Sequence, residues 1–177
     1  GVPGALVSVV CNTALNRSIK EFALQTPGEI LDKTRELVLT EFEKSEDEVS
    51  DGMDIALIRI NGNKLSFSGA NNPLWIVRKN SHLVEDVKGC KQSIGLTNNP
   101  TAFITHETDL SAGDCVYVFT DGYSDQFGGP KGKKFKSRAF KELLQSVNKE
   151  PINQQKEILE TTMKTWKGKL DQVDDIC

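Results

Sequence analysis

The sequence predicts an α+β fold in which antiparallel sheets are covered by helices, and the order of the helical and strand segments leads to this prediction. Two segments with the apolar spacing of helices come first, hairpin-connected strands follow, and two more helical segments precede a short last strand. A parallel sheet would instead alternate strands with helices along the chain. No repeat, low-complexity tract or linker divides the 177 residues, so residues 1–177 are expected to form one domain.

The first two helices are predicted at residues 4–19 and 27–42. In the first, the residues expected to form one buried face are Leu6, Val9, Val10, Thr13 and Ala14. The second begins with Thr26 and Glu29 at the spacing of a capping box and with Pro27 at the first helical position. Its expected core stripe is Ile30, Leu31, Thr34, Leu37, Val38 and Phe42. The acidic stretch 41–51 is predicted as a loop.

Strands are predicted at 53–60, 64–68, 74–78, 82–87, 102–107 and 115–120. The first two flank Asn61-Gly62-Asn63, which is a strong hairpin signal because Asn and Gly tolerate positive φ. Turns at 79–81 and 111–114 connect the later strands. Helices are then expected at 137–148 and 152–167, with Phe140, Leu143, Leu144, Val147, Ile158, Leu159 and Met163 facing inward.

Composition excludes several classes of protein. A net charge of -3 with 27% charged residues lacks the basic stripe of a nucleic-acid-binding protein. No apolar run approaches the length that crosses a bilayer, so no membrane contact by this chain is expected. The four cysteines (Cys11, Cys90, Cys115 and Cys177) are scattered without a Cys-x-x-Cys pair, which argues against a zinc site and favours a reducing cytoplasm. His82 and His106 are expected on strand surfaces.

Two acidic positions are the strongest candidates for chemistry. Asp121 follows the apolar run 116–119, and a second acid pair, Asp174-Asp175, lies near the end of the chain. A carboxylate fixed at a strand end can bind a divalent cation, and a second one beside it can complete part of a two-metal site for hydrolysis. The alternatives are a turn-capping role for Asp121 before Gly122 and an exposed strand-edge charge for Asp175.

Four segments carry a resemblance to a known family: 116–129, 171–176, 1–5 and 68–73. Together they resemble the SpoIIE/RsbU-type phosphatases, the bacterial branch of the metal-dependent (PPM, type 2C) serine/threonine protein phosphatases. The resemblance implies an α/β/β/α sandwich of two antiparallel sheets with a helical layer on each outer side, here without the N-terminal strands.

The resemblance also implies a mechanism and its residues. Asp121 and Asp174 would be metal ligands, and catalytic through a water activated by two Mn²⁺ or Mg²⁺ ions that attacks a phosphoserine or phosphothreonine. Gly122 and Asp175 would lie next to the metal ligands without binding the metals themselves, and Asp175 could orient a ligand or a metal-bound water. Asn72 stands where many relatives carry histidine. It either lies near the site or belongs to an Asn-Pro turn.

One departure from the family concerns the metals. In the family, the aspartate that bridges both ions lies in an Asp-x-x-Gly-His-Gly segment, and this chain begins at its last glycine. We therefore expect a domain truncated at both ends, with weakened metal binding and impaired activity.

The expected function is that of the phosphatase output domain of a bacterial signalling protein. The substrate implied by the family is a phosphorylated regulatory protein such as an anti-sigma-factor antagonist. A homodimer through 4–19 and 27–42 is possible. The lysine- and glycine-rich segment 127–136 could attract such an acidic partner or be a solvated flap. The alternative function is a non-catalytic phosphatase-like module that binds a phosphoprotein or a partner helix.

Overall fold

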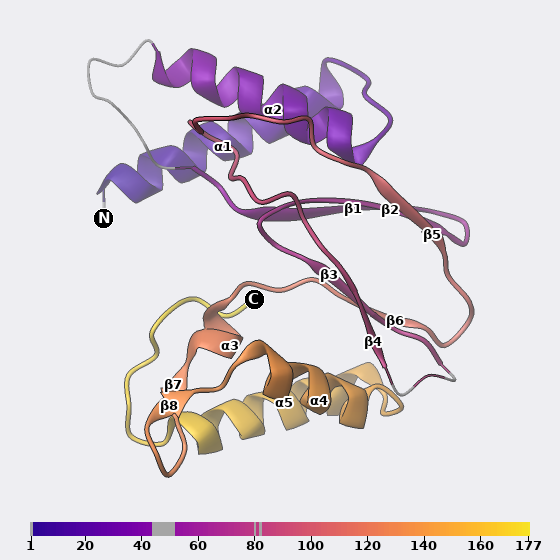
Figure 1. Ribbon diagram of the computed structural model, residues 1–177, viewed down its shortest axis with the longest axis vertical. Helices are drawn as coiled ribbons and strands as arrows, with labels where there is room; N and C mark the ends of the chain where they lie inside the picture. The colour runs from indigo at the N-terminus through magenta and orange to yellow at the C-terminus, as the bar shows by residue number, and fades with distance from the viewer. Residues whose placement is uncertain (1, 44–51, 80, 82) are drawn as a thin grey trace. The chain divides into compact units, whose positions relative to one another are not determined.

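The computed structural model describes residues 2–43, 52–79, 81 and 83–177 (Figure 1). Its helices and strands are α1 (Val2–Lys20), α2 (Pro27–Phe42), β1 (Ile55–Asn61), β2 (Lys64–Ala70), β3 (Leu74–Val77), β4 (Val84–Val87), β5 (His106–Asp109), β6 (Cys115–Tyr117), α3 (Gly122–Asp125), β7 (Phe127–Gly128), β8 (Lys133–Lys134), α4 (Ser137–Val147) and α5 (Ile152–Lys167). Helices and antiparallel strand pairs in this order confirm the α+β class. The acidic segment 44–51 and His82 lie outside the described residues.

The chain divides into two compact units. The first comprises Gly1–Leu74 and Val87–Leu110, and the second comprises Trp75–Asp86 and Ser111–Cys177. The expectation of one domain over residues 1–177 stays a prediction. Among the described residues, no helix combines the length and apolar character that crossing a bilayer requires.

In the first unit, α1 lies along α2 (Figure 1), and its predicted buried face is only partly right. Ala14 is buried and Val10 is partly buried against the core, as predicted. Val7, Cys11 and Ala14 are buried, whereas Leu6 and Val9 are about 60% exposed. The buried residues follow a stripe at i, i+4 and i+7, and small side chains on this stripe let the helices approach closely. The next position, Ser18, receives a hydrogen bond from the hydroxyl of Thr34 on α2 (3.1 Å).

The predicted start of α2 is confirmed by its hydrogen bonds. The Thr26 hydroxyl accepts from the Glu29 amide (3.4 Å), and the Glu29 carboxylate accepts from the Thr26 amide (3.1 Å). These reciprocal bonds satisfy N–H groups that have no partner within the helix. Of the predicted core stripe, Ile30, Leu31, Thr34 and Val38 are buried, and Leu37 and Phe42 are partly buried.

The first sheet has the order β1-β2-β5, with both pairs antiparallel. The β1–β2 register joins Asn61 to Lys64 across a two-residue turn in which Gly62 has φ +61°. Strand β5 begins at His106, later than the predicted residue 102. The reason lies in α2: the amide of Phe103 donates to Asp32 (3.2 Å), and the hydroxyl of Thr105 accepts from the start of α2, so this segment follows the helix instead of β2. His106 is exposed, as expected for a strand-surface residue.

The second unit contains the sheet β4-β3-β6 and the helices α3, α4 and α5. Its core is aromatic: Trp75, Phe119, Tyr123 and Phe140 have ring centroids 4.3 to 5.5 Å apart in successive pairs. Such pairs add stability beyond the burial of their area. This cluster packs the residues on both sides of position 121 into the core.

Strand β6 is shorter than predicted, because its ladder with β3 ends at the pair Trp75 and Tyr117. Residues 118–120 follow β6 and pair with no strand in the part of the chain that the structure describes. The short last strand expected after the last two helices is not formed in the described part of the chain. Residues 171–177 make no ladder there and are held by hydrogen bonds to the side chains of Gln126 and Thr120. Helix α3 and the short hairpin β7–β8 were not predicted.

Helices α4 and α5 agree closely with the predicted ranges, but one residue of α5 faces the other way. Ile158 is exposed, and the buried residues are Gln155 and Met163, with Leu159 partly buried between them. Gln155 fits this face because it accepts a hydrogen bond from the Tyr117 hydroxyl (2.9 Å) and donates to the carbonyl of Glu150 (2.9 Å). A polar residue with satisfied hydrogen bonds cannot be recognised as buried from apolar spacing alone.

A charged cluster in this unit predicts a dependence of stability on pH. The carboxylate of Asp114 accepts from the amide of Ser111, from the Arg78 guanidinium (2.9 Å) and from the amide of Lys79, which together lower the pKa of Asp114 to about 2. An unfolded aspartate titrates near pH 3.9. The group therefore contributes stability above about pH 4, and that contribution is lost as the pH falls towards 2.

We expect Asp114→Asn to lower the free energy of unfolding at neutral pH and to flatten its decline between about pH 4 and pH 2. Urea unfolding across this pH range measures both effects. Glu157→Gln, an exposed change on α5, is the matched control. If the free energy of unfolding of Asp114→Asn declines between about pH 4 and pH 2 as steeply as that of the parent, this carboxylate is not linked to folding.

Candidate active site

Asp121 directly precedes α3 and is exposed. Its main-chain carbonyl accepts from the amide of Asp125 (2.9 Å) and from the hydroxyl of Ser124 (3.0 Å), so the backbone at this point is fixed. Its side chain makes no capping hydrogen bond, and its carboxylate accepts none from the described residues. The turn-capping alternative is therefore not what the structure shows, and the carboxylate is open to an external ligand.

The end of the chain runs beside Asp121. The hydroxyl of Thr120 donates to the main-chain carbonyl of Asp175 (2.8 Å) and accepts from the amide of Cys177 (3.1 Å). A threonine hydroxyl can do both at once, so one side chain fixes two points of the segment. The residues flanking Asp121 and those flanking Asp174 are thereby brought together, although about fifty positions separate them in the sequence.

Gly122 allows this close approach. A Cβ atom at this position would lie 2.4 Å from the carbonyl oxygen of Asp175 and 3.2 Å from that of Asp174. Only a residue without a side chain fits against this backbone. The glycine after Asp121 thus has a steric reason that a turn preference would not reveal.

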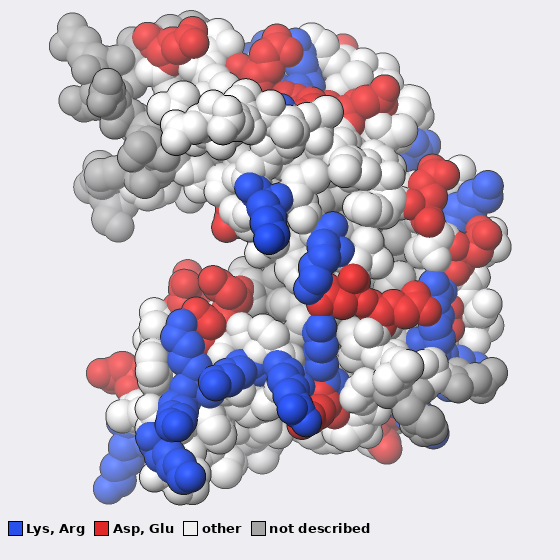
Figure 2. Space-filling view, in the orientation of Figure 1, with Lys and Arg blue, Asp and Glu red and all other residues white. Residues whose placement is uncertain are grey.

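Asp174 and Asp175 form a tight local arrangement. The amide of Asp175 donates to the Asp174 carboxylate (2.7 Å), and the carbonyl of Asp174 accepts from the side chain of Gln172 (2.9 Å). Both aspartates are exposed, and no hydrogen bond from a described residue reaches the carboxylate of Asp175. In Figure 2, acidic side chains gather over this end of the chain.

Gln126 holds the same segment from behind and was not recognised in the sequence. It is fully buried, and its side-chain amide donates to the carbonyls of Asp171 (2.9 Å) and Phe127 (3.1 Å) while its oxygen accepts from the amide of Val173 (3.2 Å). Its own carbonyl accepts from the indole of Trp166 (3.0 Å). Gln126 therefore ties α3, the end of α5 and the Asp174 segment together.

No sequence signal marks Gln126, because an isolated glutamine is usually a surface residue. Thr120 carried a weak signal, since it precedes Asp121 at the end of an apolar run. Each of these residues acts through hydrogen bonds to main-chain groups of residues 171–177, and main-chain partners leave no pattern in the side-chain sequence.

The carboxylates of this site can act as hard oxygen ligands, but they do not make a full cage. Among the described residues, no group of three or more histidine, cysteine, aspartate or glutamate side chains is arranged to hold a metal ion. Oxygen ligands are those that Mg²⁺ and Mn²⁺ prefer.

Asn72 belongs to the first unit and Asp121 to the second. Its amide donates to the carbonyl of Ala70 (2.6 Å) in a tight turn, and the preceding Asn71 has φ +57°. The side chain of Asn71 donates to the carboxylate of Asp54 (2.9 Å), which also accepts from the hydroxyl of Ser93 (2.6 Å). This turn agrees with the Asn-Pro turn alternative, and the structure leaves a role of Asn72 at the site as a prediction.

Comparison with known proteins identifies the family. The family model "Stage II sporulation protein E (SpoIIE)" matches residues 1–177. The SiaA-PP2C domain of Pseudomonas aeruginosa is similar with a TM-score of 0.86 and 29% identity, over 99% of this chain and 68% of that chain. No curated protein sequence matches the chain.

Two further structures share the fold at lower identity. The RsbU and RsbW domains of Rv1364c from Mycobacterium tuberculosis give a TM-score of 0.70 and 21% identity over 99% of this chain and 46% of that chain. A serine/threonine phosphatase of S. agalactiae gives a TM-score of 0.63 and 19% identity over 98% of this chain and 78% of that chain. The chain therefore belongs to the SpoIIE family of PP2C-type serine/threonine phosphatase domains.

Proposed function

We propose that this domain hydrolyses phosphoserine or phosphothreonine on a regulatory protein with the help of Mn²⁺ or Mg²⁺, as the output domain of a bacterial signalling protein. One observation carries the proposal: Thr120 and Gly122 hold the Asp174-Asp175 segment against the backbone beside Asp121. Two chain segments far apart in sequence thus touch through their backbones, and each carries aspartates next to the point of contact.

The residues present fit a hard divalent cation. The carboxylates of Asp121 and Asp174 would hold it, and Asp175 would lie beside them with a carboxylate that no described residue engages. When bound, such ions would activate water for attack on phosphorus and neutralise charge on the phosphoryl oxygens. A crystal of the Bacillus subtilis SpoIIE phosphatase domain described as presoaked with Mn supports manganese as the first metal to test.

The remaining residues of the site keep these ligands in position. Thr120 and Gln126 anchor the segment on both sides of Asp174, and Gly122 leaves room for its carbonyls. Ligands fixed in this way need no reorganisation when charge develops on the phosphoryl group. No nucleophilic side chain is needed for this reaction.

Partners and location remain part of the proposal. A phosphorylated anti-sigma-factor antagonist is the substrate we favour, in line with the RsbU and RsbW domains of the mycobacterial neighbour. The exposed Leu6 and Val9 on α1 support a homodimer through the first helices, because large apolar side chains are costly in water. The four free cysteines are consistent with a reducing cytoplasm.

The test is hydrolysis of a phosphoserine peptide by the full-length gene product with and without Mn²⁺. We expect phosphate release that requires Mn²⁺ and stops when EDTA removes it. The 177-residue chain alone is expected to bind Mn²⁺ weakly in a calorimetric titration, since two or three carboxylates make a poor cage. Peptide binding without any hydrolysis in the full-length protein would favour the non-catalytic module instead.

A further inference from the structure

Lysine side chains form a continuous surface in the second unit, which we call the basic patch. Figure 2 shows Lys and Arg side chains gathered over the part of the unit that carries β7, β8 and the end of α5. The members of the patch are Lys131, Lys133, Lys134, Lys136, Lys164, Lys167 and Lys169. Segments 127–136 and 164–170 contain no acidic residue.

The two segments of the patch are joined by Trp166. The amide of Gly129 donates to the carbonyl of Trp166 (2.8 Å), and the Trp166 ring packs on Phe135 with centroids 5.2 Å apart. A Cβ atom on Gly128 would lie 1.9 Å from the same carbonyl, so the hairpin meets α5 backbone to backbone. The hairpin lysines are therefore held on a folded support and do not lie on a free loop.

Local structure explains only some of these charges. Lys164 and Lys167 lie in the last turn of α5, where cations stabilise the helix dipole. Lys134 pairs with Asp125 (2.6 Å). The other lysines of the patch have no carboxylate partner among the described residues, and Lys131, Lys133 and Lys136 are exposed.

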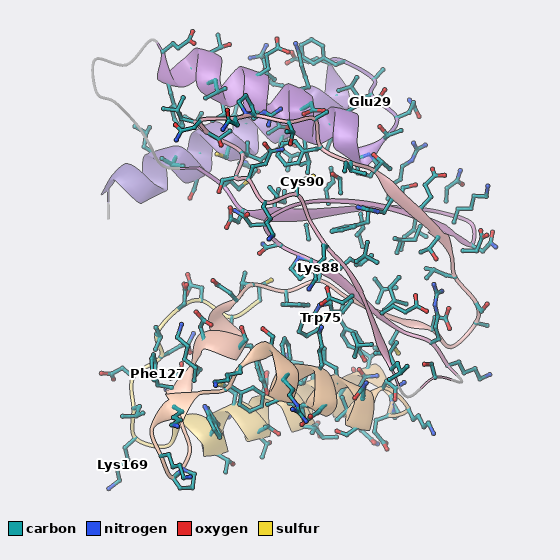
Figure 3. All side chains as sticks on the ribbon, in the orientation of Figure 1. Glu29, Trp75, Lys88, Cys90, Phe127 and Lys169 are labelled. Carbon is teal, nitrogen blue, oxygen red and sulfur yellow. The ribbon has the colours of Figure 1, made fainter. Side chains whose placement is uncertain are left out.

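A groove of about 830 Å³ lies between the hairpin segment and the end of α5, and Lys167 and Lys169 are the patch lysines that line it. It is lined by glycines, threonines, aromatic rings and lysines, and no acidic residue lines it. Phe127 and Leu170 are exposed at 40% and 48%, and Figure 3 labels Phe127 and Lys169 on this part of the molecule. The surface thus offers cations together with apolar contacts.

We propose that the basic patch is a docking surface for an acidic segment of the phosphorylated substrate protein. This inference rests on the proposed function and adds to it the recognition of residues around the phosphorylated one. A groove with cations and no acids attracts an acidic peptide electrostatically, and its apolar residues give the peptide contacts that a purely electrostatic surface lacks. The hairpin β7–β8 directly follows α3, and the indole of Trp166 donates to the carbonyl of Gln126 at the end of α3 (3.0 Å), so the patch adjoins the helix that Asp121 precedes.

The experiment measures binding and not catalysis, so it remains informative if hydrolysis fails. A fluorescent peptide with glutamates on both sides of a phosphoserine is titrated with the full-length protein and followed by anisotropy. The triple variant K131Q/K133Q/K136Q is expected to bind about tenfold more weakly, as three weak charge contacts imply. The matched control K64Q/K91Q/K149Q removes the same charge from exposed lysines elsewhere and is expected to bind like the parent.

Further arms of the experiment identify the ligand. Raising the ionic strength from about 0.01 M to about 0.15 M shortens the Debye length from about 30 Å to about 8 Å and should weaken binding in the parent more than in the patch variant. A peptide with serines in place of the glutamates should bind alike to both proteins. Equal loss of affinity in the control triple overturns the proposal.

A membrane is the competing ligand for a basic surface. Vesicles of phosphatidylcholine and phosphatidylserine in equal parts test it by sedimentation. Patch-dependent binding to these vesicles without patch-dependent binding of the acidic peptide would overturn the choice of a protein partner. Patch-dependent peptide binding without Mn²⁺-dependent hydrolysis would leave the docking surface standing and reject the phosphatase activity.

Discussion

Replacement of Asp121 by asparagine is expected to lower Mn²⁺-dependent hydrolysis of a phosphoserine peptide by the full-length protein about 10³-fold, which corresponds to about 4 kcal/mol of transition-state stabilisation. Asparagine keeps the size of the side chain but removes the negative charge that a hard cation needs. The Asp121 carboxylate is exposed and accepts no hydrogen bond from the described residues, so the fold should not need it. Phosphate release at saturating Mn²⁺ is the measurement.

The free energy of unfolding of Asp121→Asn shows whether the loss of hydrolysis comes from the missing carboxylate or from misfolding. The free energy of unfolding of Asp121→Asn should stay within about 0.5 kcal/mol of the parent, as for other surface substitutions. Asp125→Asn is the matched control, since it makes the same change within α3 at a carboxylate that pairs with Lys134. Undiminished hydrolysis by Asp121→Asn would remove Asp121 from the site.

Replacement of Gln126 by leucine is expected to destabilise the second unit by about 3 kcal/mol. Leucine keeps the volume but removes three hydrogen bonds, to the carbonyls of Asp171 and Phe127 and from the amide of Val173, and each contributes about 0.5–1.5 kcal/mol. Urea unfolding measures the loss. Hydrogen exchange at the Val173 amide should also become faster, because this amide loses its acceptor on Gln126 while the bonds of the segment to Thr120 remain.

The control for this change is Gln154→Leu, an exposed substitution of the same kind on α5. It should leave the free energy of unfolding and the exchange of Val173 nearly unchanged. If Gln126→Leu keeps full stability but loses Mn²⁺ binding, the residue positions the ligands without supporting the fold. If it changes neither, the hydrogen bonds of Gln126 contribute nothing that solvent cannot replace.

The predictable part of the fold follows from local signals. Thr26 and Glu29 are three residues apart, and this spacing alone defines the start of α2. Asn61-Gly62 likewise predicts the β1–β2 turn, because glycine accepts the positive φ found there. Both signals lie within a few residues, where sequence and conformation are directly linked.

The failures have a tertiary cause. On α1 the predicted Ala14 is buried, but packing against α2 buries Val7 and Cys11 and leaves Leu6 and Val9 exposed. The start of β5 moved because the Asp32 carboxylate of α2 accepts from the amide of Phe103, and the amide of Gly28 donates to the Thr105 hydroxyl. Packing partners that are distant in sequence decide between faces and between hydrogen-bond partners, and no single segment encodes that decision.

In the candidate site, too, some residues carry a signal in the sequence and others are identified only by their contacts in the structure. Asp121 could be proposed from the sequence because it follows an apolar run, and Asp174 and Asp175 because they form an acid pair that resembles the end of the family's domain. Gln126 and Thr120, which hold the acids in place, use main-chain partners and could not be selected. Candidate ligands can therefore be proposed from side-chain chemistry in the sequence, whereas residues that hold the chain through main-chain hydrogen bonds are found only in the structure.

The unequal exposure of the cysteines has a practical consequence. Cys11 is buried, which raises the pKa of its thiol, whereas Cys177 is exposed two residues after Asp175. Alkylating reagents attack the thiolate, so a maleimide fluorophore should couple to Cys177 much faster than to Cys11. A dye attached to Cys177 would lie two residues after Asp175 in the chain. Quenching of its fluorescence by paramagnetic Mn²⁺ would therefore report metal binding at the candidate site.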